Sequence, residues 1–103
     1  MKPIIILSTF PNKTSITKIA NQLVKKKLVA CVNIMKISSV YSWKGKIENQ
    51  PEYLGLFKTT KKNQLVLKKE LRKLHPYDIP EIAEINVDSI NQAYLKWLVD
   101  STR

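Results

Sequence analysis

The sequence is poor in the residues that build compact metal or phosphate sites. It has one cysteine and one histidine in 103 residues. The chain can therefore form no internal disulfide, and alone it cannot supply the roughly four ligands of a closed zinc site. Two glycines are too few for a glycine-rich phosphate loop, and no nucleophile elbow or paired-carboxylate spacing is present. These shortages argue against disulfide-stapled folds, zinc fingers and P-loop enzymes.

Long apolar runs are also missing, and none could cross a membrane as a helix. The apolar start, Ile4 to Leu7, is too short for a secretory signal and no small-residue cleavage site follows it. We therefore expect one domain over residues 1–103 that stays in the cytoplasm, where a single thiol remains reduced.

Acidic residues are scarce: 8 of them face 18 basic residues, for a net charge of +10. Such a charge can indicate RNA or an anionic membrane as partner. The basic residues are mainly lysines, in short runs such as Lys25–Lys27, and no arginine cluster exists to grip phosphates. We therefore expect the lysines to face solvent, with no specific nucleic acid and no membrane as partner.

The first half of the chain alternates between strand and helix periods. Ile4–Leu7 is apolar on both sides, which predicts a central strand. Asn12 is the expected N-cap of a helix over 13–28, whose apolar residues recur every three or four positions. Residues 29–43 then predict a strand with Cys31 and Val32 on opposite faces.

A hairpin and a second helix follow. Lys44-Gly45 is a turn signal, and the return strand over 47 and 53–58 is expected to be interrupted at Pro51, at a bulge or an edge. Thr59-Thr60 leads into a helix that ends before Pro76. Residues 81–87 predict a short strand, after which Asp88 or Ser89 caps a terminal helix.

The order of these elements predicts an α+β fold, a ferredoxin-like βαββαβ sandwich with a C-terminal helix. Right-handed crossovers place both internal helices on one face of the sheet. Apolar residues nonetheless occupy both faces, among them Met35, Tyr41 and Trp43. The terminal helix can cover only part of the second face, so we expect self-association.

The same fold occurs in RNA-recognition domains, which stack bases on aromatic residues of the two central strands. Here the first strand, Ile4–Leu7, carries no aromatic residue, and Tyr53–Lys58 is a poor match to the expected basic, glycine and aromatic run. We therefore disfavour RNA recognition.

The stiffest segment of the chain is His75–Glu81, which combines the single histidine, two prolines, a tyrosine and two carboxylates. The prolines restrict the backbone and hold the polar side chains in fixed directions. Two interpretations remain open for it: a binding site, or a rigid connector between a helix and a strand.

Five segments of the chain together resemble the CutA family, which is named for tolerance of divalent cations. They are Leu28–Asn33, Ser39–Ile47, Phe57–Thr59, His75–Ile82 and Tyr94–Trp97. The resemblance implies a cytoplasmic homotrimer, similar in architecture to PII signalling proteins, that binds divalent ions such as copper and has no assigned reaction. It connects Cys31 and His75 with copper, while Ser8 replaces a cysteine that some members carry.

A thiolate and an imidazole suit Cu(I), Cu(II) or Zn(II), so Cys31 and His75 are the candidate metal ligands, with Asp78, Glu81 or neighbouring chains completing the set. Purely structural roles are the competing interpretation, and for Cys31 the favoured one: free cysteine is often buried as a small apolar residue, and a histidine at a helix C-terminus is favoured by the helix dipole. No cofactor is firmly indicated, and the candidates are Cu(II), Cu(I) or another divalent cation.

Aromatic and polar residues could line a small-molecule cleft or a contact between subunits. The cleft candidates are Trp43, Lys58, Tyr77, Asp78 and Glu81, and the interface candidates are Tyr41, Tyr94 and Trp97. His75 with a nearby carboxylate could act as general acid and base, yet no nucleophile is evident. We expect a non-enzymatic, trimeric, copper-binding tolerance protein; the alternative is a PII-like small-molecule sensor or an undetected enzyme with sites at subunit junctions.

Overall fold

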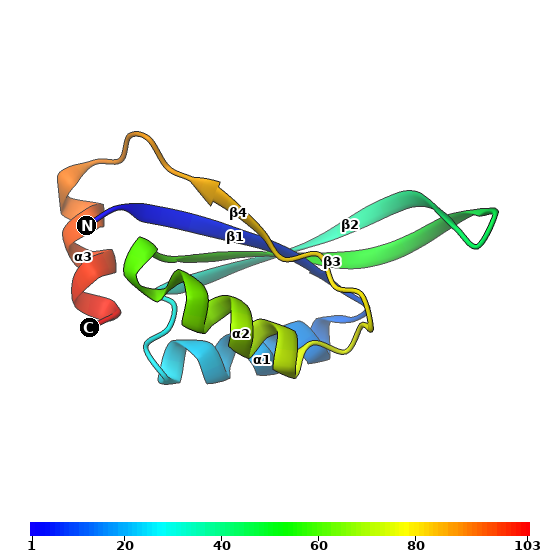
Figure 1. Ribbon diagram of the computed structural model, residues 1–103, viewed down its shortest axis with the longest axis horizontal. Coiled ribbons are helices and arrows are strands. Elements are labelled where there is room, and N and C mark those ends of the chain that lie inside the picture. The colour runs from blue at the N-terminus through cyan, green and yellow to red at the C-terminus, as the bar shows by residue number, and fades with distance from the viewer.

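The computed structural model describes residues 1–103 and confirms the predicted α+β, ferredoxin-like arrangement. Its four strands form one antiparallel sheet in the order β2-β3-β1-β4 (Figure 1). In chain order the elements are β1 (Pro3–Phe10), α1 (Lys13–Lys25), β2 (Cys31–Trp43), β3 (Lys46–Thr60), the 3₁₀ turn η1 (Lys61–Asn63), α2 (Gln64–Leu74), β4 (Ala83–Asn86) and α3 (Gln92–Ser101).

The core lies between the sheet and the helix pair α1 and α2, which Figure 1 shows together on one side of the sheet. Alternate residues of β1 point toward these helices, as the period of a strand requires. Burying each large apolar side chain contributes about 1.5–3 kcal/mol, so this layer dominates stability. The core comprises Ile4, Ile6, Phe10, Ile16, Ile19, Leu23, Val29, Phe57, Leu67 and Leu71.

The opposite face of the sheet is largely uncovered. Cys31 pairs with Lys58, and Lys58 pairs with Ile5, so all three share this face while Ile4 and Ile6 point to the helices. The helix α3 covers only the end near the chain termini, where the Lys58 ammonium lies 5.9 Å from the centre of the Tyr94 ring. We call the side of the sheet that α1 and α2 leave bare the open face.

The hairpin between β2 and β3 projects beyond the rest of the molecule (Figure 1). Its turn is the predicted Lys44-Gly45, with φ of 50° and 79°, the left-handed pair that a two-residue hairpin turn needs. The predicted interruption at Pro51 is wrong, because β3 runs unbroken through the register pair of Ser38 and Pro51. A proline is tolerated there because β1 pairs with β3 only from Tyr53 onward, which leaves that edge of the strand free.

Three predicted boundaries are also wrong. The helix expected over 13–28 ends at Lys25, where Lys27 adopts a left-handed φ of 61°. Leu28 and Lys27 then donate to the carbonyls of Leu23 and Val24, which is a Schellman motif without its usual glycine. The predicted N-cap is confirmed, since the Asn12 side chain accepts from the Ser15 amide at 2.8 Å.

The other two boundaries lie toward the C-terminus. The strand predicted over 81–87 is limited to Ala83–Asn86, and α3 is preceded by Asn91 in the N-cap position instead of Asp88 or Ser89. Glu84 turns toward the helix side, where ion pairs with Lys61 and Lys68, both at 2.7 Å, replace apolar packing. This edge of the sheet is therefore held partly by charge.

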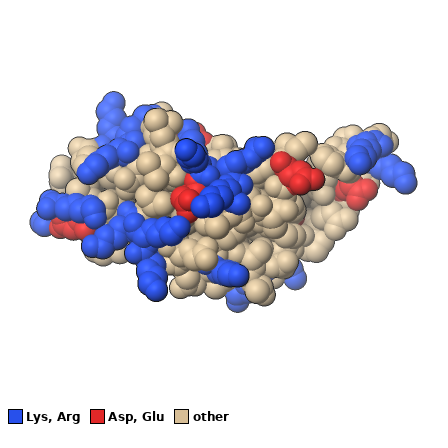
Figure 2. Space-filling model, turned by 60° about the horizontal axis from the view of Figure 1, so that its bottom comes forward, with Lys and Arg blue, Asp and Glu red and all other residues tan.

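Lysine and arginine side chains spread across the helix-bearing side, and few acidic groups are visible there (Figure 2). Lys25, Lys26 and Lys27 are all exposed, as predicted for solvent-facing lysines. None of the helices is long and apolar enough to span a membrane.

Candidate functional site

His75 is placed by the end of α2. Pro76 disfavours helical geometry in the preceding residue, and His75 accordingly leaves the helix with an extended backbone, φ −68° and ψ 136°. Its imidazole turns inward, is 9% exposed, and stacks on the Phe10 ring with centroids 4.3 Å apart. The histidine therefore closes the core at the point where β1 ends.

Both ring nitrogens of His75 have partners within the chain. The Tyr77 amide donates to Nδ1 at 3.2 Å, and Nε2 lies 3.0 Å from the Ser8 hydroxyl oxygen. Because Ser8 itself donates to the Glu81 carbonyl at 2.6 Å, the network assigns the imidazole proton to Nε2, which donates to Ser8. Burial lowers the pKa of His75, with the backbone of Thr9 acting in the opposite direction; the ring is neutral at pH 7.

Cys31 and His75 do not meet within one chain. Cys31 is half-buried on the open face, whereas His75 contacts Ser8 and Phe10 on the helix side of β1. Nowhere does the chain bring three or more histidine, cysteine or carboxylate side chains close enough to hold one ion. A single chain therefore cannot form a complete metal site that contains both Cys31 and His75.

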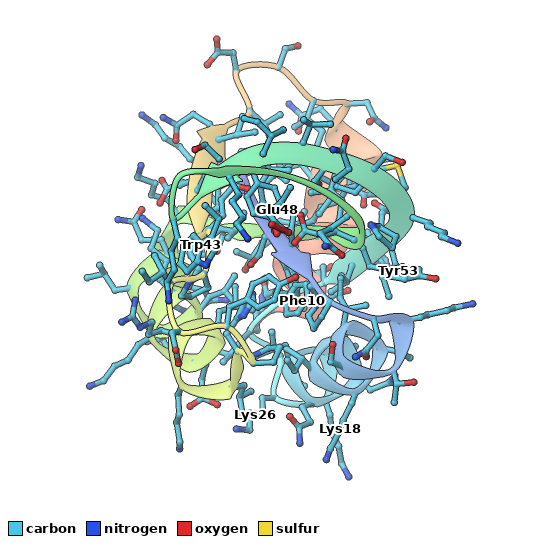
Figure 3. The ribbon with its side chains drawn as sticks, turned by 90° about the vertical axis from the view of Figure 1, so that its right-hand side faces the viewer. Phe10, Lys18, Lys26, Trp43, Glu48 and Tyr53 are labelled. Carbon is cyan, nitrogen blue, oxygen red and sulfur yellow. The ribbon has the colours of Figure 1, made fainter.

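The other conspicuous feature is a cleft of about 720 Å³ where the long hairpin meets the loop between α2 and β4. Figure 3 looks along the molecule from the hairpin end, with Trp43 and Glu48 on the hairpin and Phe10 nearer the helices. We call this the hairpin cleft. It is lined by Thr9, Tyr41, Trp43, Lys44, Glu48, Glu52, Tyr77, Asp78, Ile79 and Glu81.

A partly buried pair, Tyr77 and Glu52, forms part of the wall of the hairpin cleft. The Tyr77 hydroxyl donates to Glu52 Oε2 at 2.7 Å. Burial, and then the neighbouring Glu52 carboxylate, raise the pKa of Tyr77, so the phenol keeps its proton and continues to donate. The pair ties the rigid His75–Glu81 segment to β3.

The structure separates the predicted cleft residues into two groups. Trp43, Tyr77, Asp78 and Glu81 line the hairpin cleft together with Tyr41. Lys58 lies near the other end of the open face, beneath Tyr94, whose ring is 5.4 Å from that of Trp97.

Glu48 and Glu52 were missed as candidates. Their signal was the strand period: in the register of the hairpin they lie opposite Tyr41 and Ile37, on the same face. The expected break at Pro51 hid this alternation.

The chain matches known proteins over almost its whole length. A family model described as CutA1 divalent ion tolerance protein matches residues 4–101. A divalent-cation tolerance protein CutA from Pyrococcus horikoshii is 41% identical over 100 residues, which cover 97% of this chain and 98% of that protein. Its counterpart from Thermotoga maritima is 42% identical over 98 residues, covering 95% and 97%. The solved structure of a periplasmic divalent cation tolerance protein CutA from Archaeoglobus fulgidus has a TM-score of 0.94 at 32% identity, covering 98% and 99%.

Proposed function

This chain belongs to the CutA1 divalent ion tolerance family, and from that premise we propose that it is a homotrimeric, non-enzymatic protein that binds divalent cations, copper among them. The family assignment supports a role in tolerance of metal ions. The trimer, the choice of copper and the absence of catalysis are the finer parts of the proposal, and each has its own support.

The observation that carries the proposal is the open face. A single chain leaves large apolar side chains on it substantially exposed, with Met35 and Ile85 each at 44%. A soluble monomer rarely keeps such a surface bare. Packing of copies on this face would cover it and would bring Cys31, which lies on the same face, close to a neighbouring chain.

Metal binding at Cys31 or His75 requires donors beyond those of one chain, because these residues lie on opposite faces of the sheet. Neighbouring copies can supply them in a trimer. An ion at His75 must also replace one of the two hydrogen bonds of its ring. Imidazole and thiolate ligands favour copper over magnesium or calcium.

A titration with Cu(II) by calorimetry tests the proposal, using wild type, His75→Ala and Cys31→Ser. Light scattering should give a mass of about three times 11.9 kDa for each. We expect His75→Ala to weaken Cu(II) binding, because neutral imidazole is a good ligand. Cys31→Ser should instead affect binding of Cu(I). Unchanged affinity in His75→Ala, with the trimer intact, would remove His75 from the metal site.

The geometry of Ser8 and His75 supports a non-enzymatic role. In a hydrolase, a histidine nitrogen without a proton accepts the serine proton. Here Nε2 donates to Ser8, and Nδ1 accepts from a backbone amide where a carboxylate would be needed. This serine is held as a structural bridge, not activated as a nucleophile.

We also propose a cytoplasmic location and no specific nucleic-acid partner. The single cysteine suits a reducing compartment, although the relative from Archaeoglobus fulgidus is named as periplasmic. Cell fractionation tests the location. The alternative of a PII-like small-molecule sensor is favoured by one observation, the hairpin cleft.

A further inference from the structure

We propose that the hairpin cleft is a binding site for a small organic cation, an ammonium group attached to an apolar body. This site is separate from Cys31 and His75, and it goes beyond the binding of divalent metal ions. Three features of the cleft carry the inference: the distribution of carboxylates, the burial of Glu52 and the exposed aromatic rings.

The carboxylates of this basic chain are concentrated at the cleft. It has 8 acidic residues and a net charge of +10, yet Glu48, Glu52, Asp78 and Glu81 all line this one cavity. None of these four belongs to an ion pair. Three carboxylates elsewhere, those of Glu70, Glu84 and Asp100, each pair with two basic side chains. The lining of the cleft is thus locally acidic, with four carboxylates and one cation, Lys44, which forms no ion pair with any of them.

Glu52 is the decisive member of this group. It is only 9% exposed, and its single hydrogen bond goes from the Tyr77 hydroxyl to Oε2, which leaves Oε1 without a partner in the protein. This oxygen is open to the cavity, and a positive charge placed beside a largely buried carboxylate is favourable. The vacant side of Glu52 is therefore where a ligand ammonium gains most.

The aromatic walls indicate that the cation is organic. Trp43 is 50% exposed and Tyr41 is 42% exposed, and Tyr77 adds a third ring to the lining. Aromatic faces attract ammonium groups and also pack against an apolar body. The Lys44 ammonium already lies 5.9 Å from the centre of the Trp43 ring, so a cation over this ring is compatible with the fold.

The spread of the carboxylates argues against a metal ion as occupant. No three of them lie close enough together to hold one ion, whereas an organic cation can reach several parts of a cavity at once. The volume of about 720 Å³ is also in the range of small-molecule sites, about 300–1,000 Å³. The geometry therefore fits an extended ligand better than a point charge.

Benzylamine, which is an ammonium at pH 7, and benzyl alcohol form a matched pair of probes because they differ mainly in charge. Calorimetry with the native oligomer should show binding of benzylamine, with benzyl alcohol at least about tenfold weaker, equivalent to 1.4 kcal/mol. Glu52→Gln preserves the size of the side chain and should raise the Kd for benzylamine about tenfold or more. Exposed Asp78→Asn should raise it less.

Glu70→Gln is the control, because Glu70 lies on α2 and pairs with Lys26 and Lys73 away from the cleft; its Kd should equal that of wild type. Equal affinity for both probes, or an unchanged Kd in Glu52→Gln, would refute the site. Failure of both probes to bind the native oligomer would refute the site as well. Displacement of benzylamine by one equivalent of Zn²⁺ would assign the carboxylates to metal. None of these results depends on the copper titration, so the two proposals can fail separately.

Discussion

Removal of the Ser8 hydroxyl should destabilise the protein although it creates almost no cavity. Ser8 is fully buried in β1, and its oxygen links three parts of the chain. It accepts from His75 Nε2 at 3.0 Å and donates to the Glu81 carbonyl at 2.6 Å. In Ser8→Ala both bonds are lost, so the buried imidazole N–H and the carbonyl lose their partner together.

The magnitude follows from those two bonds. A hydrogen bond contributes about 1 kcal/mol net, and a buried group left without a partner costs about 1–3 kcal/mol. Part of the loss is recovered because the buried hydroxyl no longer has to be desolvated. We therefore expect the free energy of unfolding of Ser8→Ala to fall by about 2 kcal/mol at pH 7.5.

Urea denaturation followed by far-ultraviolet circular dichroism measures this loss. Wild type and variant must be compared at equal protomer concentration, because the stability of an oligomer depends on it. Ser38→Ala is the matched control: Ser38 is an exposed serine of β2 with no side-chain hydrogen bond, and its stability should change by less than about 0.5 kcal/mol. A loss below about 0.5 kcal/mol in Ser8→Ala would refute the bridging role.

Three further predictions can be measured in the same way or by titration. Gly55→Ala should lower the free energy of unfolding by about 1–3 kcal/mol in the same urea assay, because an added Cβ would lie 2.6 Å from Phe57 and 2.8 Å from Ile16. An unchanged free energy of unfolding would show that the Phe57 and Ile16 side chains move aside at no cost. The pKa of His75 in the folded protein is below its ordinary value of 6.5, so as the pH falls the unfolded chain takes up a proton at this residue before the folded protein does. The free energy of unfolding should therefore be independent of His75 above about pH 6.5 and should decrease as the pH drops below it. His75→Phe should flatten that part of the curve, and an equal slope would assign it to other groups. Ser8→Cys places a thiol beside His75 and should tighten Cu(I) binding over wild type in a competition titration; no gain would mean that the ring nitrogen is not available.

Local rules in the sequence predicted the hairpin turn at Lys44-Gly45 and the N-cap at Asn12, because each depends on one or two neighbouring residues. The predicted end of α1 was three residues too late, because Lys27 adopts the left-handed conformation that ends the helix. A glycine is usual at such a position, and no glycine was there to indicate it. The break predicted at Pro51 was wrong because a proline interrupts a strand only where its missing N–H would face a paired neighbour. Which edge of the strand is paired is decided by the sheet and cannot be read from the local sequence.

Part of the candidate site could be predicted from the sequence. The stiffness of the His75–Glu81 segment indicated that His75, Tyr77 and Asp78 are held in fixed directions. The sequence did not show that His75 is buried whereas Tyr77 and Asp78 line the hairpin cleft. This separation arises because the segment passes from the helix side of β1 to the open face. Glu52 enters the cleft only through the register of β3.

The sequence by itself therefore determined the order of the elements, the ferredoxin-like fold and the family, since periodicity and short motifs are carried by residues close together along the chain. The tertiary structure alone decided that Cys31 and His75 lie on opposite faces and that four carboxylates gather beside three aromatic rings. Those facts depend on strand register and on which face each residue occupies, and a shift of one residue in register would reverse them.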